Sequence, residues 1–117
     1  MYTKISDGRI TDSLSTVPVM TITDVTASRA FNLWYFNTTG KTLFVLISVQ
    51  HTSAAAGDSA KVNASVDITI PSGIENGPAR SEHSSVTLIV APNLRYTCDS
   101  IVTGASTNVL NRWIEAY

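Results

Sequence analysis

Alternation of side chains along the chain is the feature that most restricts its fold. Every second residue from Leu43 to Val49 is Leu, Val or Ile, and side chains alternate between the two faces of a strand. The opposite face carries Phe44 and Leu46 and then turns polar at Ser48. The β-branched and aromatic content argues against a helix here. The pattern predicts a strand that is buried on both faces at its start and on one face at its end.

A second strand is predicted at residues 30–36, where aromatic and apolar side chains occupy both faces. Asn37 and Gly40 follow within a short polar segment. Because Asn and Gly tolerate positive φ, a short loop containing both between two apolar runs predicts a hairpin over residues 30–50. One sheet of a sandwich buries only one face, so the second apolar face predicts contact with another subunit. The candidate interface residues are Trp34, Phe36, Phe44, Leu46 and Trp113.

Composition also favours an all-β domain. Thr, Val and Ile number 15, 11 and 10, whereas Glu, Lys and Gln number 3, 3 and 1. Helix surfaces are normally built from those last three residues, so a mainly helical protein is not expected. A chain of 117 residues suits one domain with a substantial core.

Seven to eight strands are predicted, separated by turns at intervals of about 8–12 residues, which favours an antiparallel sandwich. We therefore expect a single antiparallel β-sandwich, jelly-roll-like, over residues 17–117. The predicted strands cover residues 17–23, 30–36, 43–50, 61–70, 84–91, 94–99 and 108–116.

The regions between and before these strands supply the candidate contact residues. Residues 1–16 are polar and aperiodic, and are expected to form an extended N-terminal arm that anchors the protein. Its candidate anchoring residues are Tyr2, Ile5, Ile10 and Leu14. Residues 51–59 and 71–80 are predicted loops, and long loops tend to be functional. The candidate receptor-contact residues are His51, Thr52, Asp58, Ser72, Glu75, Asn76 and Arg80.

Charge and hydropathy argue against several classes of partner. The net charge is −1 and no basic patch suggests nucleic acid. No apolar run approaches the roughly 20 residues needed to cross a membrane, so no membrane insertion is expected. The N-terminus lacks an apolar signal-peptide core, which predicts synthesis in a cytosol. The single cysteine, Cys98, forms no intrachain disulfide and is predicted to be buried and inert.

No motif in the chain predicts catalysis, a metal or a cofactor. His51 and His83 are the only histidines, and neither has ligand-spaced neighbours. A Ser-His-Asp triad stays open because serines are abundant, but there is no G-x-S-x-G elbow. We therefore predict that the protein is not an enzyme. Trp34 and Trp113 could stack on a sugar, although packing in a core or interface is favoured.

Five short motifs follow one another along most of the chain. They are SRAF at 28–31, YFNTTGK at 35–41, FVLISV at 44–49, VAPNLRY at 90–96 and WIE at 113–115. In this order and spacing, residues 25–117 resemble the C-terminal head domain of bacteriophage tail-fibre proteins. The resemblance implies a β-sandwich head that usually trimerises and meets the host surface at the tip of a fibre.

The resemblance predicts a virion structural protein, made in the bacterial cytoplasm, that contacts a host receptor or a neighbouring tail protein. Its expected partners are identical copies in a homotrimer, other virion proteins, and a host glycan or protein. Two departures are an N-terminal region of only about 25 residues and Asn93 where the family usually has glycine. They suggest a capsid decoration or cement protein, anchored by residues 1–16, as an alternative. A small carbohydrate-binding module is a second alternative.

Overall fold

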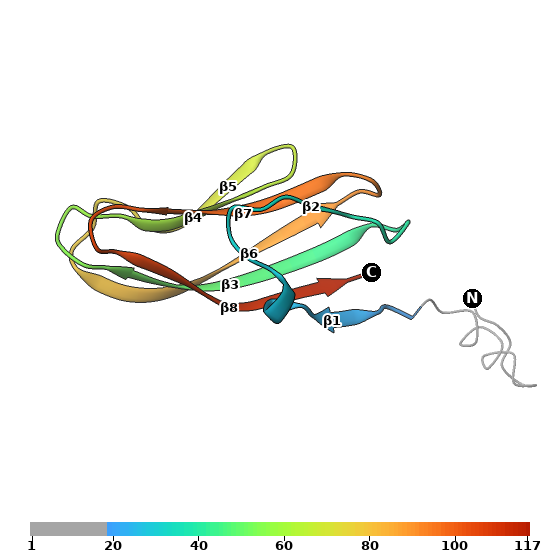
Figure 1. The fold of residues 1–117 in the computed structure, drawn as a ribbon, viewed down its shortest axis with the longest axis horizontal. Coiled ribbons are helices and arrows are strands. Elements are labelled where there is room, and N and C mark those ends of the chain that lie inside the picture. The colour runs from blue at the N-terminus through green and yellow to red at the C-terminus, as the bar shows by residue number, and fades with distance from the viewer. Residues whose placement is uncertain (1–18) are drawn as a thin grey trace, which may run out of the picture.

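A computed structural model of the protein describes residues 19–117, which form two stacked four-stranded antiparallel sheets (Figure 1). This confirms the predicted β-sandwich. Among these residues, no helix has the length and apolar character needed to cross a membrane. The strands are β1 (Ile22–Asp24), β2 (Tyr35–Phe36), β3 (Leu43–Ser53), β4 (Ala60–Ser65), β5 (Thr69–Ile74), β6 (Arg80–Val90), β7 (Arg95–Val102) and β8 (Thr107–Ala116), and a 3-10 turn, η1, spans Thr26–Ser28.

Sheet A has the strand order β1-β8-β3-β6, and sheet B has the order β2-β7-β4-β5. Every strand in the first half of the fold pairs with one in the second half: β1 with β8, β2 with β7, β3 with β6 and β4 with β5. Within the described residues, β4 and β5 are the only consecutive strands that pair. All other connections cross from one sheet to the other, which wraps the chain around a shared core.

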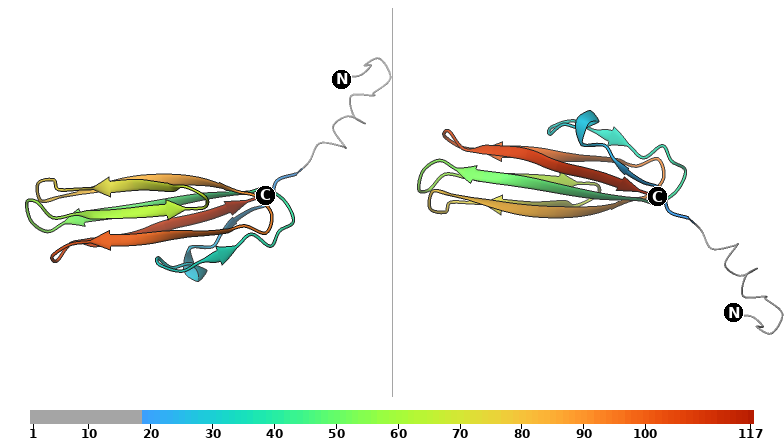
Figure 2. Two further views of the ribbon diagram at one scale, coloured as in Figure 1. Left: turned by 90° about the horizontal axis from the view of Figure 1, so that it is seen from above. Right: turned by 90° about the horizontal axis from the view of Figure 1, so that it is seen from below.

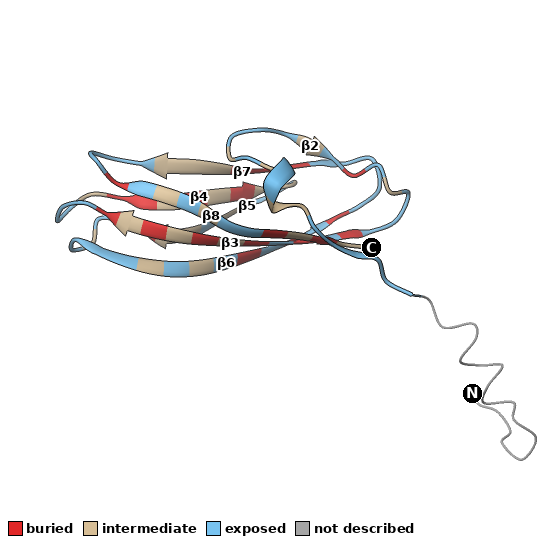
Figure 3. Cartoon of the chain, turned by 60° about the horizontal axis from the view of Figure 1, so that its bottom comes forward, coloured by how far each residue is buried: buried red, intermediate tan, exposed pale blue. Residues whose placement is uncertain are grey.

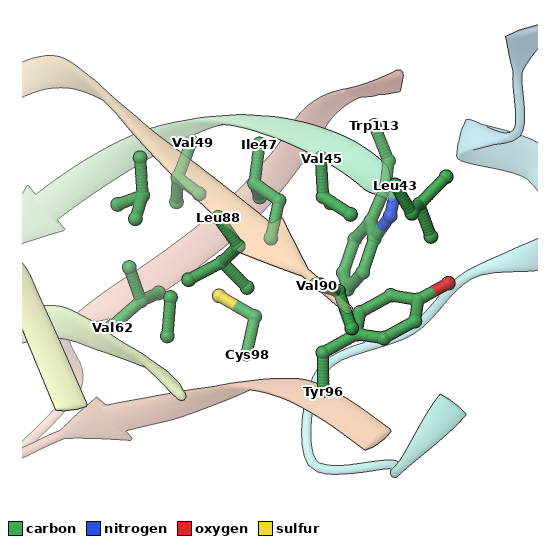
Figure 4. Packing of buried hydrophobic residues seen from close by; sticks show 12 residues of the cluster. Leu43, Val45, Ile47, Val49, Val62, Leu88, Val90, Tyr96, Cys98 and Trp113 are labelled. Carbon is green, nitrogen blue, oxygen red and sulfur yellow. The ribbon is translucent and has the colours of Figure 1, made fainter. Parts of the chain in front are cut away.

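The core lies between the two sheets. The alternating residues from Leu43 to Val49 are almost fully buried, as predicted. They face Val62 and Cys98 of sheet B and lie beside Leu88 of β6 in their own sheet (Figure 4). Each fully buried aliphatic side chain contributes about 1.5–3 kcal/mol. The prediction that β3 begins with both faces buried is wrong for the single chain. Phe44 and Leu46 remain 39% and 41% exposed, and burial alternates along the strand (Figure 3).

The predicted hairpin over residues 30–50 is wrong, although its turn is present. β2 pairs with β7 in sheet B, whereas β3 pairs with β6 and β8 in sheet A. The buried Asn37 amide explains the crossing, because its Nδ2 donates to the carbonyl oxygens of Lys41 at 2.7 Å and Val90 at 2.9 Å. These bonds tie the connection to the end of β6, so the chain changes sheet.

The predicted strand at residues 61–70 is two strands. β4 ends at Ser65, and the Val66 amide donates to the Ile68 carbonyl oxygen at 3.2 Å to close a turn into β5. Ile68 consequently projects into solvent. Since β5 runs to Ile74, the predicted loop at residues 71–80 is reduced to 75–79.

The remaining strand predictions agree with the structure within a few residues. Predicted strands 84–91, 94–99 and 108–116 correspond to β6, β7 and β8. Of the predicted strand at 17–23, the described part, residues 19–23, contains the start of β1. The predicted arm at residues 1–16, with Tyr2, Ile5, Ile10 and Leu14, lies outside the described residues.

Candidate functional site

Three loops gather at one end of the sandwich, and we call them the loop tip. They are residues 54–59 between β3 and β4, 75–79 between β5 and β6, and 103–106 between β7 and β8. Figure 2 places this end opposite the C-terminus and β1. The strand directions bring the loops together, because β3, β5 and β7 all end at the same side.

Hydrogen bonds join the three loops into one surface. The Gly57 amide donates to the Gly77 carbonyl oxygen at 2.9 Å. The Thr103 amide donates to the Ser59 carbonyl oxygen at 3.0 Å, and the Ser59 amide donates to Thr103 Oγ1 at 2.8 Å. Loop 54–59 is therefore bonded to both of its neighbours, which restrains the relative positions of the loops.

Gly104 allows the closest contact within the loop tip. Its φ is +59°, and a Cβ there would lie 2.5 Å from Asp58 Oδ2. Asp58 Oδ1 also accepts a hydrogen bond from Thr103 Oγ1 at 3.2 Å. A side chain at Gly104 would push the Asp58 carboxylate away, so this contact depends on glycine.

The surface of the loop tip is mostly small, with charge at its side. Residues 54–57 and 103–105 are exposed and consist of Ala, Gly and Thr. Glu75 Oε2 lies 3.1 Å from Lys61 Nζ, and Arg80 Nε lies 3.2 Å from Glu82 Oε2. Exposed pairs of this kind contribute at most about 1 kcal/mol. They provide charges available to a partner rather than stability.

The structure brings together four of the seven predicted receptor-contact residues. Asp58, Glu75, Asn76 and Arg80 lie in or beside the loop tip. The other three predictions require correction, because the strands extend further than expected. His51 is a buried residue of β3, Thr52 is a half-buried residue of β3 whose Oγ1 lies 3.1 Å from Ser81 Oγ, and Ser72 belongs to β5.

Loop 103–106 was missed as a contact candidate. The segment lies between the predicted strands at 94–99 and 108–116, but the sequence gave no indication that it lies beside the other two loops. That proximity depends on strand pairing, which places the ends of β3 and β7 at the same end of the sandwich.

His51 belongs to a buried polar network. Asn108 Nδ2 donates to the Lys61 carbonyl oxygen at 2.7 Å and to Ser100 Oγ at 3.0 Å. Asn108 Oδ1 is therefore free to accept from His51 Nδ1 at 2.7 Å, which leaves His51 Nε2 to accept from Ser84 Oγ at 2.6 Å. The network connects the two sheets and satisfies the polar atoms of a buried histidine.

The Ser84-His51-Asn108 order is that of a Ser-His-amide triad, but its packing is structural. A Cβ at Gly73 would lie 2.7 Å from His51 Cε1, so β5 packs directly against the imidazole. A substrate would need room beside both Ser84 Oγ and His51. Within residues 19–117 there is also no group of three His, Cys, Asp or Glu side chains that could hold a metal ion.

Residues from four of the five short sequence motifs meet at the opposite end of the core. Glu115 accepts hydrogen bonds from Arg29 Nε at 3.0 Å and Nη2 at 3.0 Å, Tyr96 Oη at 2.5 Å and Trp113 Nε1 at 3.1 Å. The Arg29 guanidinium stacks 4.6 Å from the Tyr35 ring centroid. Burial, followed by the Glu115 carboxylate, raises the pKa of the Tyr96 phenol. We call these five residues the Glu115 cluster.

Trp113 is completely buried in the Glu115 cluster, so the prediction that it lies at a subunit interface is wrong. Its indole packs edge-on to Tyr35 with ring centroids 5.7 Å apart. Burial also removes it as a sugar-stacking residue. The apolar side of β8 points inward at this position, which a sequence pattern cannot distinguish from an outward face.

The other four predicted interface residues are exposed, but on two separate surfaces. Phe44 and Leu46 lie on the outer face of sheet A. Trp34 and Phe36 lie beside β7 in sheet B, where Phe36 pairs with Arg95 and the Arg95 guanidinium stacks 4.2 Å from the Trp34 ring centroid. These two surfaces cannot form one continuous interface within a protomer.

No protein-family model, curated protein or solved structure matches this chain. The β-sandwich, the loop tip and the exposed apolar surfaces therefore carry the functional argument.

Proposed function

We propose that this protein is a bacteriophage virion structural protein, similar to a tail-fibre tip, that contacts a host receptor or a neighbouring tail protein. The observation that carries this proposal is the position of the loop tip. It lies at the opposite end of the sandwich from β1, where the N-terminal part of the chain enters the fold (Figure 2). A protein anchored to a particle through that N-terminal part presents its three joined loops outward.

Two further observations support the proposal. The pairing of β1 with β8, β2 with β7, β3 with β6 and β4 with β5 supports a jelly-roll arrangement, an architecture used by viral structural proteins. Four of the five motifs on which the proposed likeness to tail-fibre heads rests also contribute residues to the Glu115 cluster. A role in folding explains why separate short motifs would occur together in one domain.

The proposed protein acts by binding, as a homotrimer within the virion. Catalysis, a cofactor, nucleic-acid binding and membrane insertion form no part of the proposal. Its receptor is a glycan or protein of the host surface, contacted by the small side chains of the loop tip and by Asp58, Glu75, Asn76 and Arg80.

The proposal is tested on purified phage particles. Antibodies against the chain, used in immunogold electron microscopy, should label the distal end of the tail. Labelling distributed over the capsid would instead support the decoration protein, and particles without label would reject both. Deleting residues 1–16 should remove the protein from particles while leaving its circular dichroism spectrum unchanged.

The loop tip is tested separately by changing its small residues. Ala55→Arg and Ala105→Arg should reduce binding of the recombinant protein to host cells at least about tenfold, because bulky charge blocks close contact. Thr38→Arg, in the turn between β2 and β3 at the end opposite the loop tip, provides an exposed control and should bind like the unmodified protein. Equal binding by all three variants would remove the loop tip as the contact surface.

The exposed Trp34, stacked by Arg95, favours the carbohydrate-binding alternative over a role for Trp113. A glycan array tests it directly. Binding that is lost in Trp34→Ala would support this alternative, whereas binding that depends only on the loop tip would reject it.

A further inference from the structure

We infer that copies of this chain join edge to edge, with β1 of one copy alongside β6 of the next, so that sheet A continues from subunit to subunit. The inference identifies the contact surface of the assembly in the proposed function, and it rests on that function. It follows from the free edges of the sheets, the register of the apolar residues and the direction of the strands.

β6 is the long, unprotected edge among the described strands. It has 11 residues and pairs on one side only, with β3. The edges of sheet B are restricted, because β2 has two residues and β5 contains Pro71, which lacks a backbone N–H. An exposed edge presents unpaired N–H and C=O groups, and natural proteins cover or protect such edges.

One apolar row crosses the whole outer face of sheet A. Its members in register are Ile22 in β1, Ala116 in β8, Phe44 in β3 and Ile89 in β6. The two ends of the row are among the more exposed apolar side chains, with Ile22 at 69% and Ile89 at 64%. A copy placed beside β6 through its own β1 brings Ile22 against Ile89 and extends the row.

The strand directions permit this junction. All neighbours in sheet A are antiparallel, in the order β1-β8-β3-β6. β1 and β6 consequently run in opposite directions, so the β1 of the next copy lies antiparallel to β6. Backbone hydrogen bonds of the kind already present within the sheet can then continue across the junction.

Further apolar surface lies at both edges. Ile89 lines a cleft of about 230 Å³ beside β6, together with Val66, Ile68, Ile70, Thr87 and Leu88. On the other side of the junction, Val19 and Met20 precede β1 and are exposed. Apolar side chains are thus exposed at both opposite edges of one sheet, and a second copy of this chain would bury those of one edge against those of the other. We therefore take a second copy as the partner.

A contact between two different edges is heterologous, and it closes into a ring when the rotation between copies allows it. With the outer faces of sheet A turned toward the ring axis, Phe44 and Leu46 become buried there. In the row nearer the loop tip, the β6 edge is polar, since Gln50 of β3 pairs with His83 of β6. The junction is therefore confined to the β1 end and leaves the loop tip free.

Disulfide trapping tests the junction. In a Cys98→Ala background, the pair Ile22→Cys and Ile89→Cys should form intersubunit disulfides, because opposed antiparallel residues have Cα atoms about 4.5–5.5 Å apart. Mild oxidation should produce a ladder that ends at the ring size on a non-reducing gel. Either cysteine alone should remain uncross-linked, and Ile22→Cys combined with Ser81→Cys, at the polar end of β6, should also fail.

Other outcomes overturn the inference. A cross-linked dimer of the Ile89→Cys variant alone would mean that β6 pairs with β6. Sedimentation velocity on the same samples separates this junction from self-association in general. An assembly that forms no cross-links would reject the junction between β1 and β6 but preserve self-association. A monomer throughout the micromolar range would reject both the junction and the homotrimer. Virion labelling and host-cell binding test the remaining parts of the proposed function independently.

A charge variant gives a second test without cysteines. Ile89→Asp should dissociate the assembly while leaving the circular dichroism spectrum unchanged, because this side chain is mostly exposed in the protomer. Ser81→Asp introduces the same charge on the same face of β6, away from the apolar row, and should remain assembled. Equal behaviour of the two variants would contradict the inference.

Discussion

Replacing Glu115 by glutamine should destabilise the fold by about 3 kcal/mol. The side chains of Arg29 and Glu115 are only 19% and 11% exposed, so solvent screens their ion pair weakly. Leaving one partner of a buried pair without the other typically costs about 3–5 kcal/mol, and hydrogen bonds to charged groups contribute about 1.5–3 kcal/mol each. We take the lower end because glutamine retains one oxygen acceptor.

The geometry of the acceptor explains the loss. Glu115 Oε2 accepts from Arg29, Tyr96 and Trp113, so the glutamine oxygen should occupy that position. Its amide nitrogen would then face Arg29 Nη2, where Glu115 Oε1 accepts at 3.0 Å. Two donors would oppose each other, and the Arg29 charge would lose its partner.

Urea unfolding followed by circular dichroism measures the effect, and thermal unfolding should show a melting temperature lower by roughly 10–15 °C. Glu82→Gln provides a matched control, since its pair with Arg80 is well exposed and should contribute less than about 1 kcal/mol. Equal losses of unfolding free energy for the two variants would refute the argument that the Glu115 cluster stabilises the fold.

Three further predictions concern a thiol, a phenol and a glycine. Burial, followed by the charge of Asp99, raises the pKa of the Cys98 thiol to about 12, so a thiol reagent at pH 8 should label the unfolded chain fully and the native protein hardly at all. The raised pKa of Tyr96 means that the fold favours the neutral phenol. Its contribution to the free energy of unfolding is complete below about pH 10 and is lost as the pH rises further, by up to about 1.4 kcal/mol per pH unit. Tyr96→Phe should therefore reduce the loss of stability at alkaline pH that urea unfolding measures. Gly104→Ala should lower the free energy of unfolding by about 1–3 kcal/mol, because it adds a contact with Asp58 to the strain of positive φ. Gly40→Ala, with φ of +77° and no atom within 4 Å of the added Cβ, should lower it by about 1 kcal/mol. Equal losses for the two variants would argue against the Asp58 contact.

Local periodicity predicted most individual strands, although the predicted strand at residues 30–36 is reduced to Tyr35–Phe36. The alternation from Leu43 to Val49 identified both β3 and the side chains that form the core, because face alternation depends only on backbone geometry. The same periodicity failed at residues 61–70. There the apolar alternation continues through Val66 and Ile68, so the pattern carried no sign of the turn that separates β4 from β5.

Pairing between distant strands could not be predicted from local pattern. The Asn37 and Gly40 signal correctly indicated a turn, but β2 pairs with β7 instead of β3. The choice depends on the Asn37 hydrogen bond to Val90, more than 50 residues away. The same limit applied to the candidate site, where loops 54–59 and 75–79 were identified in part and loop 103–106 was missed.

The sequence by itself determined that this is an all-β protein, which positions alternate, and where most turns fall, because these properties follow from neighbouring residues and composition. Where large apolar side chains lie outside such a clear alternation, only the tertiary structure decided which of them face the core. Trp113 and Phe44 are both large apolar side chains on neighbouring strands, yet one is buried against Tyr96 and the other is exposed. The difference arises because a sheet buries the face that meets another sheet, and that contact is made by residues far apart in the chain.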